Sequence, residues 1–296
     1  MKTATVVNED YIGDILFSSS IAKELKEQLG YDKIFYVTRF VQPEILLRNN
    51  PYIDGFNELT FPRGDVFRVS KVDQSKPVTI QYQEQCGIPI PRLEYTVYLK
   101  HQDLIDIFSR SQDVNRTPMI AIQRNWIERV YQFTKEEYWR GIDVPYKGYG
   151  GRIPDLNKII VELNKKYNMI YVGGEPGVSQ FDSKLASAKS YYETAKTIAS
   201  CDYMLGSESG LTNLAAGLNT RCIITTCFIA QLYGPNGLMK KIQNPQMGPA
   251  VYFPNAGHSH LNPFLTENEI IDSIIDIIDN NRPTVYDWNE LRPENV

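Results

Sequence analysis

Short apolar runs alternate along the first part of the chain with longer segments in which apolar residues recur every three or four positions. Residues 3–8 predict a buried strand, and residues 15–29 predict an amphipathic helix that ends at Gly30. Residues 34–38 predict a second strand and residues 42–49 a second helix. Strands and helices that alternate at this spacing indicate βαβ units and a parallel sheet, so the expected fold class is α/β.

The pattern is less regular between residues 57 and 118 and becomes regular again beyond them. Within the irregular part, residues 78–83 and 94–99 predict strands and residues 102–111 predict a helix. Beyond it, the pattern predicts strands at 119–123 and 169–174 and helices at 155–167 and 270–278.

Residues 194–227 combine a helix, a short strand, a polar turn, a second helix and a second strand. The turn is Gly206-Ser207-Glu208-Ser209-Gly210, and the second helix opens at Leu211. The first N–H groups of a helix have no acceptor within the helix, and the helix dipole is positive at that end. A strand, a polar turn and a helix start in this order therefore predict an anion site.

Three residues of this turn and helix would contribute directly to such a site. Gly210 has no side chain and would let a ligand approach the backbone, while Ser209 and Thr212 carry hydroxyl donors. The alternative interpretation is that the turn only starts a helix, with Ser207 or Ser209 as its N-cap.

Length and charge narrow the class of protein. The 296 residues and 33.9 kDa suffice for two domains. The net charge is -4 and neither half is basic, so general nucleic-acid binding is not expected. The chain opens without a long apolar core and holds no apolar run of spanning length, which predicts a cytoplasmic protein without a signal peptide or transmembrane segment. Peripheral contact with a membrane stays open.

The cysteine and histidine positions do not indicate a metal site. The four cysteines form no C-x-x-C pair, and those in apolar strand-like runs predict buried, reduced thiols. His258 and His260 form an H-x-H pair in what reads as an exposed loop, without carboxylates or thiols nearby in the sequence. No D-x-D triplet occurs, so the sequence also lacks this common carboxylate motif for a divalent cation on phosphates.

The segment TAKTIASCDYMLGSESGLTNLAA resembles the donor-site signature of glycosyltransferase family 9, the heptosyltransferase group. In that family a helix precedes the pattern "a-d-l-x-v-g-x-D-S-G-x-x-H-L-A-A-A", and the turn holds the diphosphate of a nucleotide-sugar. The family aspartate is Glu208 here, and the family histidine is Asn213. The resemblance implies that Glu208, Ser209, Gly210, Thr212 and Asn213 bind the donor.

The opening of the chain resembles the same family. Gly13, Asp14 and the block Asn50-Pro51-Tyr52-Ile53-Asp54 match its first segment, while Ser18 and Ser20 replace the family threonine and proline. The resemblance implies that Gly13 lies at the donor site and that Asp14 is the general base. The alternative for Asp14 is the N-cap of a helix that begins at Ile15.

Further donor contacts are implied less directly. A glycine-rich loop at residues 146–152 carries Lys147 and Arg152, and it resembles the family loop that brings a basic residue to the donor phosphates; Arg124 competes for that role. Gly174 and Glu175 stand where the family has an acidic residue that reaches the nucleotide ribose.

Together the two blocks imply a GT-B-type protein with two Rossmann-like doubly wound domains that face a central cleft. The expected division is 1–130 for the acceptor-side domain, 131–275 for the donor domain, and a tail at 276–296 that packs back on the first domain. The implied function is metal-independent, inverting transfer of a sugar from a nucleotide-sugar to a hydroxyl of a glycan or other acceptor. No cofactor besides this co-substrate is implied. A degenerate nucleotide- or sugar-binding module and a nucleotide-sugar epimerase are the alternatives.

Overall fold

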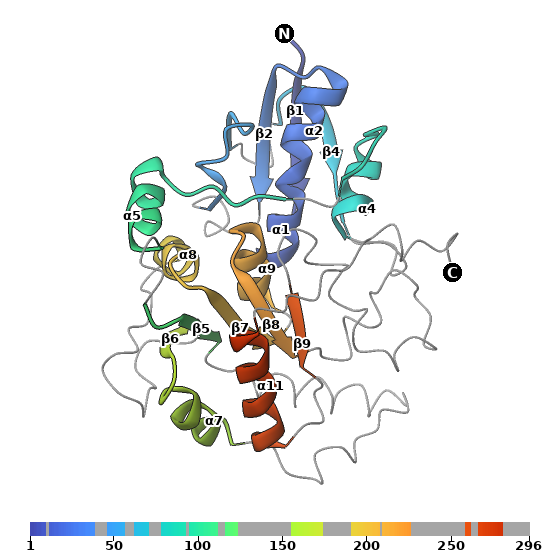
Figure 1. Ribbon diagram of the computed structural model, residues 1–296. Coiled ribbons are helices and arrows are strands. Elements are labelled where there is room, and N and C mark those ends of the chain that lie inside the picture. Colours follow the sequence, from blue (N-terminus) through green and yellow to red (C-terminus); the bar gives the residue numbers. More distant parts are fainter. Residues whose placement is uncertain are drawn as a thin grey trace, which may run out of the picture.

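The computed structural model of the protein describes most of the expected strands and their helices (Figure 1). The described residues are 1–9, 12–38, 46–56, 62–70, 78–92, 95–111, 116–123, 155–173, 191–207, 209–225, 258–261 and 266–280.

Within the described residues, four parallel strands form the first sheet, in the order β3-β2-β1-β4. The strands are β1 (Thr3–Asn8), β2 (Lys33–Thr38), β3 (Gly55–Phe56) and β4 (Asp65–Arg68). The described helices in this part of the chain are α1 (Ile12–Ser18), α2 (Ser20–Leu29), α4 (Val78–Gln85) and α5 (His101–Ser111).

In the part of the chain that the structure describes, five parallel strands form the second sheet, in the order β6-β5-β7-β8-β9. The strands are β5 (Met119–Gln123), β6 (Asn168–Val172), β7 (Tyr203–Ser207), β8 (Arg221–Thr225) and β9 (His258–Leu261). The helices are α7 (Leu156–Leu163), α8 (Tyr191–Ala199), α9 (Gly210–Gly217) and α11 (Glu267–Asp279). The predicted α/β class with parallel sheets is therefore confirmed.

The single helix expected at residues 15–29 is two helices, α1 and α2, separated at Ser19. The hydroxyls of Ser18 and Ser20 donate to the carbonyl oxygens of Ile15 (2.8 Å) and Phe17 (3.1 Å), three residues earlier. Such side-chain bonds compete with the regular helical ladder and explain the break. The expected end of α2 is confirmed, because its C-cap Gly30 has a left-handed φ of 67°.

The strand expected at residues 78–83 is wrong, since these residues belong to helix α4. Val78, Tyr82 and Cys86 are all buried at a spacing of four, which is one face of a helix. Polar and apolar residues alternate at 78–83 as in a half-exposed strand, but the polar residue Gln83 is buried as well. Its amide donates to the Ser20 hydroxyl (2.9 Å) and to a backbone carbonyl at Arg92 (2.7 Å), so an apparently polar position faces the interior.

Two other segments differ from the sequence prediction in whether they pair with a sheet. Tyr95, Val97 and Leu99 are buried alternately, as expected of a strand, but they join no sheet. Instead, the Val97 N–H donates to the carbonyl oxygen of Gly217 at the end of α9 (2.8 Å). The loop expected around His258 and His260 is strand β9, which pairs with β8 at the edge of the second sheet. Its few apolar residues gave no strand signal.

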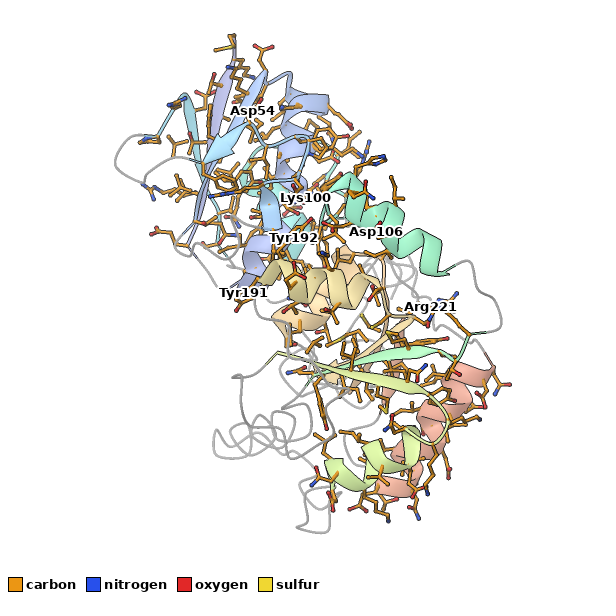
Figure 2. All side chains as sticks on the ribbon, turned by 90° about the vertical axis from the view of Figure 1, so that its left-hand side faces the viewer. Asp54, Lys100, Asp106, Tyr191, Tyr192 and Arg221 are labelled. Atoms are coloured by element: carbon orange, nitrogen blue, oxygen red, sulfur yellow. The ribbon has the colours of Figure 1, made fainter. Side chains whose placement is uncertain are left out.

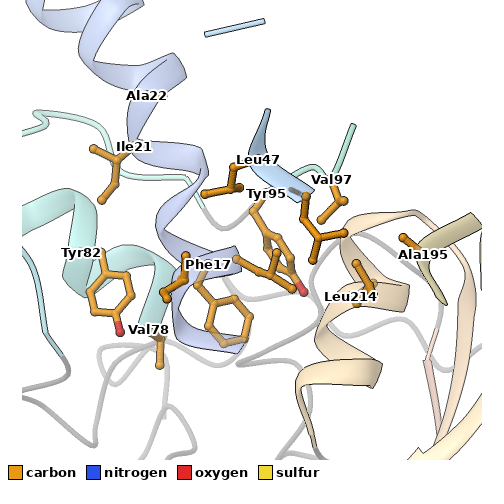
Figure 3. Close-up of a cluster of buried hydrophobic side chains, with 14 of the residues drawn as sticks. Phe17, Ile21, Ala22, Leu47, Val78, Tyr82, Tyr95, Val97, Ala195 and Leu214 are labelled. Carbon is orange, nitrogen blue, oxygen red and sulfur yellow. The ribbon is translucent and has the colours of Figure 1, made fainter. Parts of the chain in front are cut away.

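One hydrophobic core joins helices from both sheets. It contains Phe17 of α1 together with Ala195 of α8 and Leu214 of α9. Figure 3 shows the Phe17 ring beside Tyr95, with Leu214 across from them. In Figure 1, α1 and α9 accordingly lie between the two sheets. A second cluster covers the other side of the β5–β9 sheet with α7 and α11.

The sheet assignment bears on the expected division of the chain. Strand β5 precedes residue 130 but pairs with β6 and β7, so the chain changes sheets between Arg68 and Met119. Residues 276–279 belong to α11 and Asn280 is its C-cap, while residues 281–296 of the expected tail lie outside the described residues. The domain boundaries themselves stay predictions.

The cysteines in the described part of the chain are buried free thiols, as the sequence predicts for those in apolar strand-like runs. Burial raises the pKa of Cys86 and Cys201 to about 12, which keeps both thiols protonated at neutral pH. Cys227 lies outside the described residues. None of the helices that can be described is long and apolar enough to cross a membrane.

A polar latch connects α5 to α8. The Tyr192 hydroxyl donates to Asp103 Oδ2 (2.7 Å) and accepts from the Lys100 N–H (2.8 Å), while Lys196 Nζ lies 3.0 Å from Asp103 Oδ1. Figure 2 shows Tyr192 and Lys100 at this junction. The hydroxyl of Tyr192 and then the ammonium of Lys196 hold the pKa of Asp103 below its usual value.

The latch predicts an acid-dependent loss of stability. A carboxyl whose pKa is lowered by folding stabilises the fold above its unfolded pKa of about 3.9, and this contribution is lost as the pH falls through the folded pKa. We expect urea unfolding free energies to fall between pH 7 and pH 3, and to fall slightly less in Asp103→Asn. The difference should be small because exposed ion pairs contribute little. Equal acid dependence in both proteins would contradict the assignment.

Candidate functional site

The start of α9 is built by a capping box. Ser209 is the N-cap, and its hydroxyl oxygen accepts from the Thr212 N–H (3.4 Å). In return, the Thr212 hydroxyl accepts from the Ser209 N–H (2.9 Å). The N-cap interpretation of Ser209 is thus confirmed. A capped N-terminus also suits an anion, because the N–H groups of Gly210 and Leu211 have no acceptor within the helix.

Thr212 contributes to this start from the inside. Its side chain is fully buried, and its hydroxyl also donates to the Ser209 carbonyl oxygen (2.9 Å). This geometry holds the turn in shape rather than presenting a hydroxyl to a ligand. The main-chain N–H groups of Gly210 and Leu211 are consequently the donors that the capping box leaves without an acceptor inside the helix.

Gln123, at the carboxyl end of β5, is a site residue that the sequence analysis missed. Its side chain is 2% exposed, and its Oε1 accepts from the Ser209 hydroxyl (3.2 Å). A Cβ placed on Gly206 would lie 2.8 Å from the same Oε1, so the absence of a side chain there makes room for the amide. The available signal was a polar residue as the last position of an otherwise apolar strand.

The ends of three strands meet at the start of α9. Gly173 follows β6 with φ +74°, and a Cβ on it would lie 2.5 Å from Leu211 Cδ1. β5 and β7 are neighbours in the sheet, and the strand order runs in opposite directions on either side of them. In open parallel sheets, ligands bind outside the carboxyl ends of the strands at such a switch point.

The predicted base, Asp14, lies in the first turn of α1, which follows the carboxyl end of β1. It is 6% exposed, and its backbone carbonyl oxygen accepts from Asn8 Nδ2 (3.4 Å). The alternative role of Asp14 as N-cap is wrong, because the helix begins at Ile12, two residues before it. A carboxylate in a first turn is favoured by the helix dipole.

The two blocks that resemble the family meet in space. A Cβ on Gly13 would overlap with Nδ2 of Asn213 and would lie 3.5 Å from Gly210 Cα. The start of α1 therefore lies directly against the start of α9, although nearly 200 residues separate them in the chain. Glycine at position 13 is needed for this close approach.

Tyr95 supports this junction from the core. Its hydroxyl donates to the Asn213 carbonyl oxygen (2.6 Å), and its ring meets Phe17 of α1 edge-on at a centroid distance of 5.0 Å. A Cβ on Gly217 would lie 2.8 Å from both Tyr95 Cε2 and Val97 Cγ2. The chain between the two sheets thus locks α9 against α1.

The Asn50–Asp54 block has a structural role in the first sheet. Asn50 Oδ1 accepts from the Tyr52 N–H (3.0 Å), which closes a turn. Asp54 Oδ2 accepts from the Ile34 N–H of β2 (2.8 Å) and lies 2.8 Å from Lys26 Nζ. These contacts account for the block without a role in chemistry.

Several predicted donor residues lie outside the described part of the chain: Arg124, Lys147, Arg152, Gly174, Glu175 and Glu208. Their roles stay predictions. Among the residues with described positions, no group of three or more histidine, cysteine, aspartate or glutamate side chains could hold a metal ion.

Comparison with known proteins gives a match in fold. The sequence matches no protein-family model and no curated protein sequence. The structure resembles the glycosyl transferase family 9 protein from Veillonella parvula, with a TM-score of 0.59 and 12% identity over 94% of this chain and 98% of that one. It also resembles the ADP-heptose lps heptosyltransferase II of E. coli, with a TM-score of 0.56 and 11% identity over 95% and 99%.

A third match is the dodecameric iron-containing heptosyltransferase TibC of enterotoxigenic E. coli in complex with ADP-D-beta-D-heptose. There the TM-score is 0.52 and the identity 14%, over 77% of this chain and 58% of that one. The chain has the fold of family 9 glycosyltransferases. At these identities the likeness establishes the fold, and it agrees with the family that the two sequence blocks resemble.

Proposed function

We propose that this protein is a glycosyltransferase that moves a sugar from a nucleoside-diphosphate donor to an acceptor hydroxyl. The observation that carries the proposal is the junction of α1 and α9, where Gly13 lies against Asn213 and Gly210. Gly13 directly precedes Asp14, so the proposed base belongs to the helix start that lies against the N-terminus of α9. Transfer needs both a base for the acceptor and a site for the leaving diphosphate.

In this proposal, Asp14 accepts the proton of the acceptor hydroxyl as that oxygen attacks the anomeric carbon. The bond from the sugar to the diphosphate breaks on the opposite side, which inverts the anomeric centre. The N–H groups of Gly210 and Leu211 stabilise the charge that develops on the departing diphosphate. A basic side chain from Arg124, Lys147 or Arg152 completes the neutralisation.

The donor and the division into domains follow from the same reasoning. Two fold relatives are named for ADP-heptose, so ADP-heptose is the first donor to test, with Glu175 expected at the ribose. The two sheets would form the acceptor and donor sides of a GT-B-type cleft.

We propose metal-independent transfer, because the helix dipole and basic residues can replace a cation and the sequence lacks D-x-D. TibC is described as iron-containing, so this point requires a direct test.

The test is a thermal-shift screen with ADP, UDP, GDP, CDP and their sugars, each with and without EDTA. A ligand that binds only the folded protein raises the melting temperature. We expect a shift with one nucleoside diphosphate that persists in EDTA. A shift that disappears with EDTA would contradict metal independence, and no shift with any of them would contradict the proposed function.

Gly210→Ala should separate donor binding from folding. In the protein, a Cβ at this position would make only an ordinary contact, 3.7 Å from the Gly13 nitrogen, so the folded state tolerates it. The methyl group would instead project beside the N–H groups offered to the diphosphate. We expect nucleoside-diphosphate affinity to fall about tenfold, with stability within about 1 kcal/mol of wild type. Calorimetric titration and urea unfolding measure the two effects.

A further inference from the structure

We infer that Gln123 is a positioning residue of the diphosphate site, acting through Ser209. The inference deepens the proposed function and rests on it. It starts from the location of Gln123 as the last residue of β5, beside the switch point at which the start of α9 lies. A polar side chain that is 2% exposed at this point is held by specific partners rather than by solvent.

The hydrogen bonds around Ser209 define what Gln123 does. A serine hydroxyl has one proton, and Ser209 gives it to Gln123 Oε1 (3.2 Å). Its oxygen accepts from the Thr212 N–H at the same time. The amide of Gln123 thereby fixes the rotation of the hydroxyl, with the oxygen directed at the third helical N–H.

The consequence concerns which groups remain for the ligand. Because Ser209 and Thr212 satisfy one another, the diphosphate is left to the N–H groups of Gly210 and Leu211. Gly206 secures this arrangement, since a Cβ there would lie 2.8 Å from Gln123 Oε1 and 3.1 Å from Gln123 Cβ. Gln123 sets the shape of the site and remains neutral, which an anion site requires of a buried neighbour.

Gln123→Glu tests the inference because it keeps size and the acceptor oxygen but adds a negative charge. We expect nucleoside-diphosphate affinity to fall at least about tenfold at pH 8, because a buried carboxylate repels the diphosphate. Burial and the bound anion both raise the pKa of that carboxyl, so affinity should recover as the pH falls towards 6. The uncharged nucleoside should lose far less affinity, which a merely structural role would not produce.

The matched control is Gln83→Glu. Gln83 is likewise a fully buried amide beside a serine hydroxyl, that of Ser20, but it belongs to α4. It should share any loss of stability but keep the ratio of diphosphate to nucleoside affinity. The probes are ADP, UDP, GDP and CDP together with their nucleosides, and calorimetric titration measures the affinity for each of them.

The outcomes separate this inference from the function on which it rests. If wild type binds none of the four nucleoside diphosphates, the proposed function fails. If wild type binds one and Gln123→Glu binds it equally well at pH 8, only the role of Gln123 fails. If Gln123→Glu does not fold, Gln123→Met decides. This substitution removes the acceptor oxygen and adds no charge. Affinity for the nucleoside diphosphate should fall several-fold, whereas unchanged affinity overturns the inference.

Discussion

Replacing Asp14 by asparagine should reduce the turnover number by a factor of about 10² to 10⁴, which is the usual contribution of a general base. The asparagine has the same shape but cannot accept the acceptor proton. Affinity for the nucleoside diphosphate should change by less than about threefold, since that ligand is bound by α9. Turnover is measured as the initial rate of sugar transfer from the nucleotide-sugar that the thermal-shift screen identifies. Affinity is measured by calorimetric titration with the corresponding nucleoside diphosphate.

Asp103→Asn is the matched control for this result. Asp103 also lies in the first turn of a helix, but it belongs to the α5–α8 latch and not to the α1–α9 junction. It should keep near-normal turnover. Comparable turnover in wild type and Asp14→Asn would remove Asp14 from the catalytic role. If the wild-type protein binds the nucleoside diphosphate but shows no turnover, a binding module would be favoured instead.

Truncating Tyr95 should destabilise the protein by about 3–5 kcal/mol, as expected when a large buried aromatic side chain becomes alanine. Tyr95 is 2% exposed and contacts Phe17 of α1 and the carbonyl oxygen of Asn213 in α9. Tyr95→Phe removes only the hydroxyl and should cost about 1 kcal/mol. Urea unfolding gives both values, provided that the slope with denaturant stays the same.

The control for Tyr95 is Tyr191→Ala. Tyr191 is 37% exposed at the start of α8, so its removal should cost far less. If Tyr95→Ala unfolds at the same urea concentration as Tyr191→Ala, the chain segment at Tyr95 does not hold α9 against α1. A loss in Tyr95→Ala that is accompanied by weaker nucleoside-diphosphate binding would show that the junction also shapes the site.

The sequence by itself determined the alternation of strands and helices. The reason is that the spacing of apolar residues within each element reflects whether it is a strand or a helix. The strands at residues 3–8, 34–38 and 119–123 were predicted with bounds close to those observed. Ser209 could be predicted as a helix N-cap because capping depends on neighbouring residues. Local chemistry also set the end of α2 at Gly30.

Sequence reasoning failed where distant partners decide the local structure. The alternation at residues 78–83 predicts a strand, but these residues form helix α4. The amide of Gln83 is buried there by its bond to the hydroxyl of Ser20, which lies 63 residues away in the chain. The alternation at residues 94–99 predicts a strand, but the Val97 N–H in this segment donates to the Gly217 carbonyl oxygen at the end of a helix. Propensity is a weak guide when tertiary contacts supply the hydrogen bonds.

The candidate site shows the same division. The sequence identified Asp14 and the Ser209-Gly210 turn as separate motifs, through their resemblance to one family. Only the tertiary structure brought Gly13 against Asn213 and placed Gln123 on Ser209. The reason is physical: motifs are short-range patterns, whereas the meeting of two helix starts depends on how both sheets pack on one shared core.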